Sequence, residues 1–195
     1  MVLRIRPLTG AALDASLDEV ARLRIEVFRS WPYLYDGDLA YEWEYLQSYR
    51  ASKEAIVVGA FDGENLVGAA TGTPLADHAD DFAQAFDTSG LDLDRIFYCA
   101  ESVLQPAYRG QGAGHAFFDA REAHARQSGY VKSAFCSVNR PADHPLRPDG
   151  YSPLDPFWRK RGYTPLNNVE AEFSWKDIDQ DEETRKSLQF WIRDL

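Results

Sequence analysis

The chain has 195 residues, of which 45% are hydrophobic and 27% charged, a composition typical of one globular domain with a proper core. Its 31 acidic residues outnumber the 21 basic ones, giving a formal net charge of −10. That balance argues against a nucleic-acid or anionic-membrane partner, both of which need a basic surface, and mildly favours a cationic small substrate.

The two cysteines, Cys99 and Cys136, form no CxxC pair, so we expect both to be reduced and to bind no metal. No run of 18 apolar residues is present, and the N-terminal residues lack the apolar core of a signal peptide. We therefore expect a cytoplasmic protein that forms a single domain over residues 1–195.

The first part of the chain predicts a strand, two helices and a β-hairpin, from alternating apolar residues, apolar residues at helical spacing, and the favoured turn pair Asp62-Gly63. These elements are expected at residues 3–8, 13–29, 39–49 and 54–75.

The second part predicts a short helix in an acidic segment, a buried strand, a helix opened by glycines, another strand, a Pro-rich loop, a short helix and two closing strands. These are expected at residues 77–94, 95–105, 112–127, 130–138, 139–156, 156–162, 169–175 and 187–195. The last strand either closes its own sheet or pairs with a second copy of the chain. The whole pattern is mixed α/β.

Three glycines, Gly110, Gly112 and Gly114, stand where the 95–105 strand leads into a helix. Backbone amides at such a helix start form an anion site, and glycine lets an anion approach closely. A phosphate-binding loop would need Lys-Ser/Thr, which is absent, and a dinucleotide fingerprint would need glycine where His115 or Phe117 stands. The bland alternative is a tight turn that only joins strand to helix.

The run of Pro106, Arg109, Gly112 and Gly114 resembles the pyrophosphate-binding signature of the GNAT superfamily of N-acetyltransferases. The segment DPFWRKRGY, residues 155–163, is similar to a second motif of that family, and the order of elements matches over residues 3–195. The resemblance implies a mixed, mostly antiparallel twisted sheet of six to seven strands with flanking helices. It also implies acetyl-CoA as co-substrate and acetyl transfer to an amine. The four histidines are scattered and form no HxxH or HExxH pair, so we expect no metal.

The residues that the resemblance assigns to cofactor binding lie in the signature strand, the glycine turn, the end of the next strand and the short helix. They are Ser102, Val103, Leu104, Arg109, Gly110, Gln111, Gly112, Ala113, Gly114, Asn139, Phe157 and Trp158. Amides around residues 102–104 would polarise the thioester carbonyl where this strand splays from the next one.

One departure from the family pattern concerns the general acid. The family often has a tyrosine where this chain has Trp158, and an indole has no ionisable proton at working pH. The long insert over residues 140–153 could bring Tyr151 to the site as a substitute. Two functions stay open: an N-acyltransferase, and a non-catalytic coenzyme A-binding or sensing module.

Glu101 is the candidate general base because it is the one acidic residue in the apolar 95–105 run. A carboxylate desolvated there would have a pKa raised toward useful values. The alternatives are an exposed charge or a partner for an arginine, and proton loss through water would need no single carboxylate.

The acceptor-site candidates are two tyrosines and two aspartates in the PYLYDGD loop between the first two helices. They are Tyr33, Tyr35, Asp36 and Asp38. In the family this loop borders the acceptor pocket, and the aspartates would suit a cationic amine on a small molecule or a protein. The alternative is a turn rich in Asp and Gly.

Overall fold

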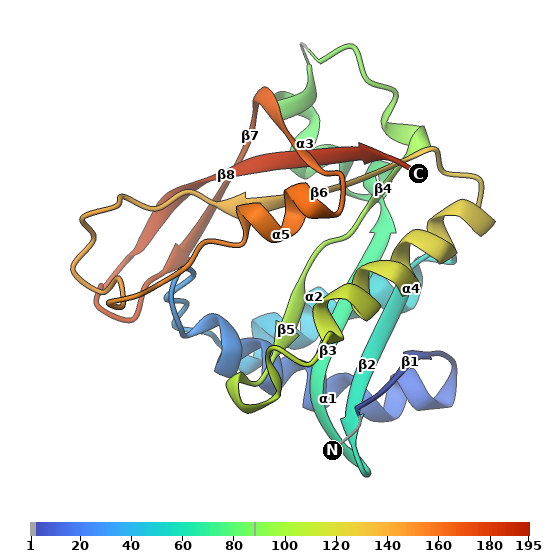
Figure 1. Ribbon diagram of the computed structural model, residues 1–195, viewed down its shortest axis with the longest axis horizontal. Coiled ribbons are helices and arrows are strands. Elements are labelled where there is room, and N and C mark those ends of the chain that lie inside the picture. Colours follow the sequence, from blue (N-terminus) through green and yellow to red (C-terminus); the bar gives the residue numbers. More distant parts are fainter. Residues whose placement is uncertain (1–2, 88) are drawn as a thin grey trace.

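The structure is a computed structural model that describes residues 3–87 and 89–195 (Figure 1). The first part contains β1 (Arg4–Leu8), α1 (Ala11–Phe28), α2 (Leu39–Ala51), β2 (Ile56–Asp62), β3 (Asn65–Pro74), η1 (Leu75–His78) and α3 (Ala79–Phe86). The second part contains η2 (Leu93–Arg95), β4 (Ile96–Tyr98), β5 (Ser102–Leu104), η3 (Pro106–Tyr108), α4 (Ala113–Gln127), β6 (Lys132–Val138), α5 (Asp155–Lys160), β7 (Thr164–Lys176) and β8 (Glu183–Asp194). The predicted order of strands and helices is therefore confirmed.

The strands form one eight-stranded sheet in the order β1-β2-β3-β4-β6-β8-β7, with β5 paired to β3. Only the β4–β6 pair is parallel in the described sheet, as expected when a helix connects the two strands. The mixed, mostly antiparallel class is confirmed. The strand count rises to eight because the predicted 95–105 strand is divided into β4 and β5.

This division is a one-residue bulge opposite β3. Tyr98 pairs with Thr73 and Ser102 pairs with Ala70, so three residues of one strand, 99–101, face two of the other. A bulge leaves the extra residue unpaired and bends the strand. The prediction of an unbroken strand was wrong because hydropathy alone does not report this change of register.

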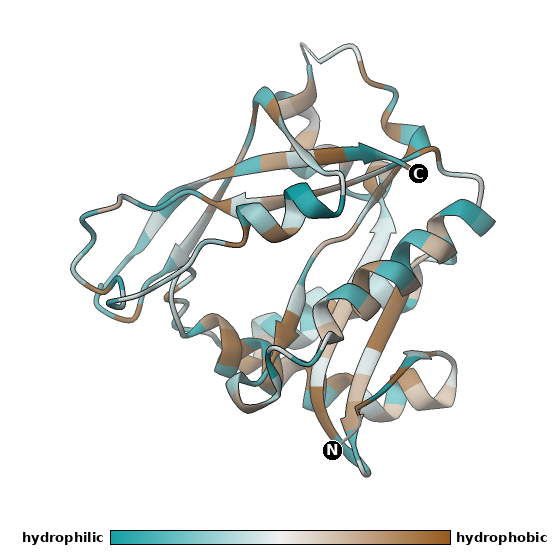
Figure 2. Ribbon diagram, in the orientation of Figure 1, coloured by the Kyte–Doolittle hydropathy of each residue, from teal (hydrophilic) through white to brown (hydrophobic). Residues whose placement is uncertain are grey.

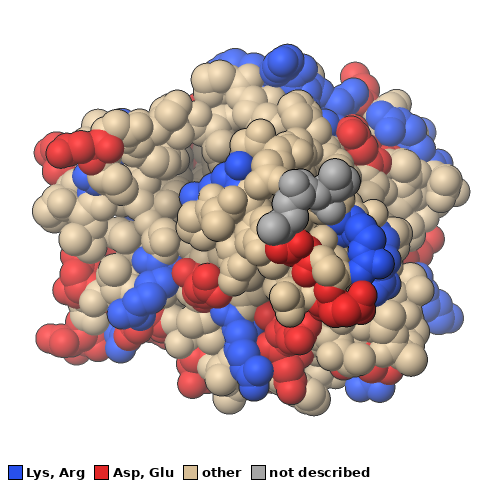
Figure 3. Space-filling view, turned by 60° about the horizontal axis from the view of Figure 1, so that its bottom comes forward, with Lys and Arg blue, Asp and Glu red and all other residues tan. Residues whose placement is uncertain are grey.

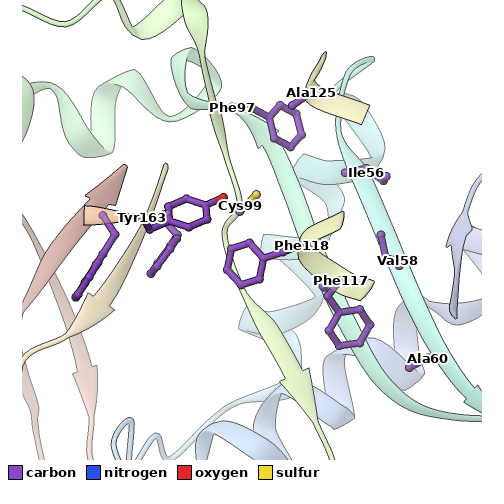
Figure 4. Close-up of a cluster of buried hydrophobic side chains, with 12 residues drawn as sticks. Ile56, Val58, Ala60, Phe97, Cys99, Phe117, Phe118, Ala125 and Tyr163 are labelled. Atoms are coloured by element: carbon purple, nitrogen blue, oxygen red, sulfur yellow. The ribbon is translucent and has the colours of Figure 1, made fainter. Parts of the chain in front are cut away.

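Helices cover both faces of the sheet (Figure 1). On one face, α1 and α2 bury Leu17, Val20 and Leu46 against Val57 and Val103. The opposite face carries α4, whose Phe117 packs toward β2 and whose Phe118 packs against Phe135 of β6. The hydroxyl of the neighbouring Tyr163 points toward Cys99 (Figure 4). Successive side chains of β2 point to opposite faces of the sheet and therefore pack alternately into the two cores.

The remaining sheet, β6–β8, is covered by α3, which inserts Phe82 and Phe86 against Phe190. Figure 2 shows that β2 and β3 are rich in hydrophobic residues, whereas polar residues lie along the outer side of α4. Within the described residues, no helix combines the length and hydropathy needed to cross a membrane.

The closing strand closes its own sheet. β8 is paired on both edges, to β6 and to β7, and Phe190 and Trp191 are buried on opposite faces. Of the two alternatives, pairing of β8 with a second copy is therefore wrong. The preceding strand is longer than predicted, because β7 continues to Thr164 through an irregular segment in which Asn168 adopts a positive φ of 63°.

Candidate functional site

Strands β4 and β6 run together for only a short distance and then diverge. Their last hydrogen bond joins the Cys99 amide to the Ala134 carbonyl at 2.8 Å. Beyond it, β5 stays with β3, while β6 continues to Val138 beside β8 (Figure 1). We call the wedge between β5 and the end of β6 the strand opening, and its existence confirms the predicted splay.

The backbone of β5 presents hydrogen-bonding groups to the strand opening. The Thr71 amide donates to the Glu101 carbonyl and the Gln105 amide donates to the Val67 carbonyl, both at 3.0 Å. In an antiparallel ladder this pattern turns the amides of Ser102 and Leu104 away from β3, toward the opening. The side chain of Val103 is buried against α1, on the opposite face, so a cofactor contact at this residue stays a prediction that concerns its backbone alone.

The glycine turn ends in the N-terminus of α4. Gly110 and Gly112 adopt positive φ angles of 76° and 85°, and a Cβ at either one would meet only open space. The amides of Ala113, Gly114 and His115 lie in the first helical turn, where no intrahelical acceptor is available. Arg109 lies beside this turn, its Nε donating to the Leu104 carbonyl at 3.3 Å. Gln111 is exposed in the same turn.

The short helix α5 forms the opposite wall. The ring of Phe157 lies 4.8 Å from that of His115, and its nearest atom is 3.5 Å from a Cβ placed on Gly114. Trp158 turns inward and packs 5.0 Å from Phe135 and 5.1 Å from Trp191. Its indole is thus half-buried and packs against the edge of the core.

Asn139 and Tyr151 lie beyond the end of β6. The Asn139 side chain donates to the Ser187 hydroxyl at 3.0 Å, which ties it to β8. The ring of Tyr151 packs edge-on to Trp31 at 5.9 Å. Burial, aided by the charge of Asp155, raises the pKa of Tyr151, so its hydroxyl keeps its proton at neutral pH. The roles of both residues stay predictions.

This geometry agrees with a family match. Residues 18–147 match the model of the acetyltransferase (GNAT) family, which is well over half of the chain. The chain belongs to the GNAT family. Its sequence has no match among curated proteins.

Solved GNAT structures share the fold over nearly the whole chain. The ribosomal-protein-alanine N-acetyltransferase of Brucella melitensis is 14% identical, with a TM-score of 0.62 and coverage of 98% of this chain and 99% of its own. The yncA protein of Salmonella typhimurium, solved with its cofactor acetyl-CoA, is 12% identical, with a TM-score of 0.61 and coverage of 100% and 95%. At such identities the likeness concerns the fold.

Glu101 has an arginine partner in this GNAT protein. Its carboxylate forms a salt bridge with Arg24 and accepts a hydrogen bond from the Tyr45 hydroxyl at 3.2 Å. The same guanidinium pairs with Glu42, which is fully buried. The alternative of a partner for an arginine is therefore confirmed, and the role of Glu101 as general base stays a prediction.

Around this cluster, one guanidinium faces two carboxylates, so one formal negative charge remains. The Arg24 guanidinium also lies 4.4 Å from the centre of the Tyr45 ring. Burial raises the pKa of Tyr45 well above its ordinary value, so the tyrosine is a neutral hydrogen-bond donor. Sequence patterns missed Arg24 and Glu42 because they read as ordinary polar positions of two helices.

The loop aspartates between α1 and α2 have structural partners. Asp38 caps α2 by accepting from the amides of Ala40 and Tyr41 at 3.0 Å. Asp36 forms salt bridges with Lys176 at 2.6 Å and Arg29 at 3.0 Å, which lower its pKa. The alternative of a structural turn therefore describes both carboxylates better than an attraction for a cation.

The loop tyrosines are packed as well. Tyr33 lies 4.6 Å from Phe28 and 6.1 Å from Trp175, and burial raises its pKa. The backbone of Tyr35 forms an isolated antiparallel β-bridge with that of Asp177. The pKa of Tyr35 is raised, mainly by partial burial and secondly by the charge of Glu42. On the face in Figure 3 the acidic and basic side chains are intermixed, so charge selection must come from local groups.

Arg140, which sequence patterns did not single out, ties three loops together. It donates to both carboxylate oxygens of Asp177, at 2.6 and 2.9 Å, and to the carbonyls of Pro32 and Tyr33. Lys186 adds a second cation, 3.2 Å from Asp177. We call Arg140, Asp177 and Lys186 the loop clamp. It joins the α1–α2 loop, the β6–α5 loop and the β7–β8 turn.

An Asp177→Asn variant should lose about 3 kcal/mol of unfolding free energy at pH 7, because two buried cations lose their counter-ion. Burial opposes ionisation of Asp177, but Arg140 and Lys186 outweigh it and lower its pKa. This carboxylate therefore stabilises the fold above about pH 4 and ceases to do so as the pH falls through its lowered pKa. Urea titrations should show the variant and the parent protein converging below about pH 4. A constant difference from pH 7 to 3 would contradict the assignment.

Proposed function

We propose that this GNAT protein forms one acyltransferase domain that moves the acetyl group of acetyl-CoA to a primary amine. The amine attacks the thioester directly in a ternary complex. The observation that carries this proposal is the juxtaposition of the open N-terminus of α4 with the outward-facing amides of Ser102 and Leu104 at the strand opening. The similar folds of the Brucella N-acetyltransferase and of the Salmonella protein solved with acetyl-CoA support it.

In this proposal the pyrophosphate of coenzyme A binds the amides of residues 110–114, where the helix end favours an anion. Arg109 adds a positive charge beside it. The pantetheine arm follows β5 through the amides of Ser102 and Leu104. Phe157 closes the other side of the passage.

The amine enters from the face of α1 and α2. A primary amine has a pKa near 10 and must lose a proton before it attacks. The Arg24–Glu42–Glu101 cluster, with its remaining negative charge, suits a cationic acceptor at this face. The proton leaves through Glu101 or through water. We assign the attraction of the amine to this cluster rather than to Asp36 and Asp38.

One specific observation favours the alternative function, a non-catalytic coenzyme A-binding module. Trp158 packs half-buried against the core, and its indole has no ionisable proton to give a leaving thiolate. The two functions share the cofactor site and differ only in turnover.

The deciding experiment combines calorimetry with a thiol-release assay on a panel of cationic, neutral and anionic amines, including peptides. We expect coenzyme A binding, and turnover with cationic acceptors. A Glu101→Gln substitution should lower kcat/KM for the amine by about 100-fold or more and leave the affinity for acetyl-CoA nearly unchanged. Glu172→Gln, on an exposed position of β7, is the matched control. Binding without turnover on any amine would favour the sensing module, and absence of binding would overturn both.

A further inference from the structure

Arg121 is a buried cation whose hydrogen-bond acceptors, among the residues that the structure describes, are all neutral. It lies on α4 with 1% of its surface exposed. Its Nη1 donates to the carbonyls of Thr71 at 3.0 Å and Glu101 at 2.9 Å, and its Nη2 donates to the Ser102 hydroxyl at 2.8 Å. Its Nε donates to the Phe117 carbonyl of its own helix at 3.2 Å. A buried charge normally has a charged partner, so an arginine held only by neutral groups needs another account.

These contacts converge on the bulge between β4 and β5. The Glu101 carbonyl already accepts from the Thr71 amide, and Arg121 adds a charged donor to it. Arg121 thus fixes the backbone at the point where the strand leaves β6. It also fixes the hydroxyl of Ser102, the first residue of β5.

Ser102 is exposed, although its oxygen reaches the buried guanidinium. A hydroxyl oxygen that accepts from a cation keeps its O–H for a second partner and becomes a stronger donor. The outward amide of the same residue borders the strand opening. The O–H is therefore available on the side of the sheet that carries α4 and α5.

The bulge separates two opposite local charges. Glu101 turns toward α1 and α2, where its cluster is negative, and Ser102 turns toward α4, where Arg121 is positive. The negative side, at Glu101, suits the cationic amine that approaches. The positive side, at Ser102 and Arg121, suits the thiolate that departs.

We propose that the Ser102 hydroxyl donates a hydrogen bond to the coenzyme A sulfur as the thioester breaks, with Arg121 as its positioning residue. This inference rests on the proposed function. The amine nitrogen forms the C–N bond, the tetrahedral intermediate collapses, and the C–S bond breaks with its electron pair on sulfur. The proton from nitrogen leaves to Glu101 or water, and the thiolate takes a proton from solvent. Ser102 supplies stabilisation and no net proton, so this step needs no proton donor at the position of Trp158.

The test measures the thiolate of bound coenzyme A directly, by its ultraviolet absorbance as a function of pH. In the parent protein we expect the bound thiol to ionise at lower pH than free coenzyme A. Ser102→Ala should raise the pKa of the bound thiol by about 1, a roughly tenfold loss of thiolate stabilisation. Ser102→Thr, which keeps a hydroxyl, should restore it. Ser174→Ala, at an exposed position of β7, is the matched control.

Activity gives the second readout. Ser102→Ala should lower kcat with acetyl-CoA by about 10–100-fold, while the affinity for desulfo-coenzyme A stays unchanged. Arg121→Gln should also raise the pKa of the bound thiol. If the Arg121→Gln protein does not fold, the Ser102 variants alone test the proposal. An unchanged thiol pKa and kcat in Ser102→Ala would overturn this inference alone. Absence of coenzyme A binding in the parent protein would overturn the proposed function as well.

Discussion

A Gly114→Asp variant is expected to fold at least as stably as the parent protein and to bind coenzyme A about 100-fold more weakly or worse. Gly114 is helical, and a Cβ there would make only an ordinary 3.5 Å contact with Phe157. A carboxylate in the first turn of α4 stabilises the helix by about 0.3–1 kcal/mol. The same carboxylate repels a pyrophosphate on these amides, and one such charge pair costs about 3 kcal/mol at an effective dielectric constant of 20.

Thermal unfolding and calorimetric titration with coenzyme A measure the two effects separately. Gly114→Asn is the matched control, because it has nearly the same shape without the charge and should lose much less affinity. Equal affinities of the Asp and Asn variants would show that no anion binds near Gly114. Gly112 is a poorer test, because its φ of 85° strains any side chain whatever binds there.

The second large effect is expected from Arg24→Met, which should lower the free energy of unfolding by about 5 kcal/mol at pH 7. The substitution leaves Glu42 and Glu101 buried together without their shared cation. Removing one partner of a buried ion pair typically costs about 3–5 kcal/mol, and here two carboxylates are affected. Urea denaturation followed by circular dichroism measures the loss.

Arg22→Met is the matched control, since Arg22 lies on α1 but is exposed. It should change stability by less than about 0.5 kcal/mol. The Arg24→Met loss should shrink in acid, because a protonated carboxyl group needs no counter-ion. A loss below about 1 kcal/mol at pH 7 would mean that the cluster is solvated and does not act as a buried ion pair.

The sequence was sufficient for the order of elements, because hydrophobic periodicity and the glycine signature are local properties. The proposed cofactor side of the site could be located in the sequence for the same reason: residues 109–114 are adjacent in the chain, and the proposal assigns binding to their backbone. The bulge was missed because it depends on register between β3 and its neighbour, which hydropathy does not encode.

The acceptor side was predicted less well, because it depends on pairs far apart in the chain. Glu101 meets Arg24, and Arg140 meets Asp177, only through tertiary contacts. A carboxylate in an apolar strand looks desolvated and unpaired until its partner helix is placed. The loop aspartates looked functional because capping and salt-bridging carboxylates have the same sequence signature as binding ones.

The strand opening depends on how many residues lie between β4 and β5, rather than on the chemistry of their side chains. Three residues span the distance from Tyr98 to Ser102 where β3 uses two. With one residue fewer, the pairing with β3 would run without interruption, and the side chains on either side of the bulge would alternate regularly. Glu101 and Ser102 could then not keep their present relation to Arg24 and Arg121. Insertions and deletions within residues 99–101 are therefore the changes that this chain tolerates least, although substitutions of Ala100 in the same segment leave the backbone count intact.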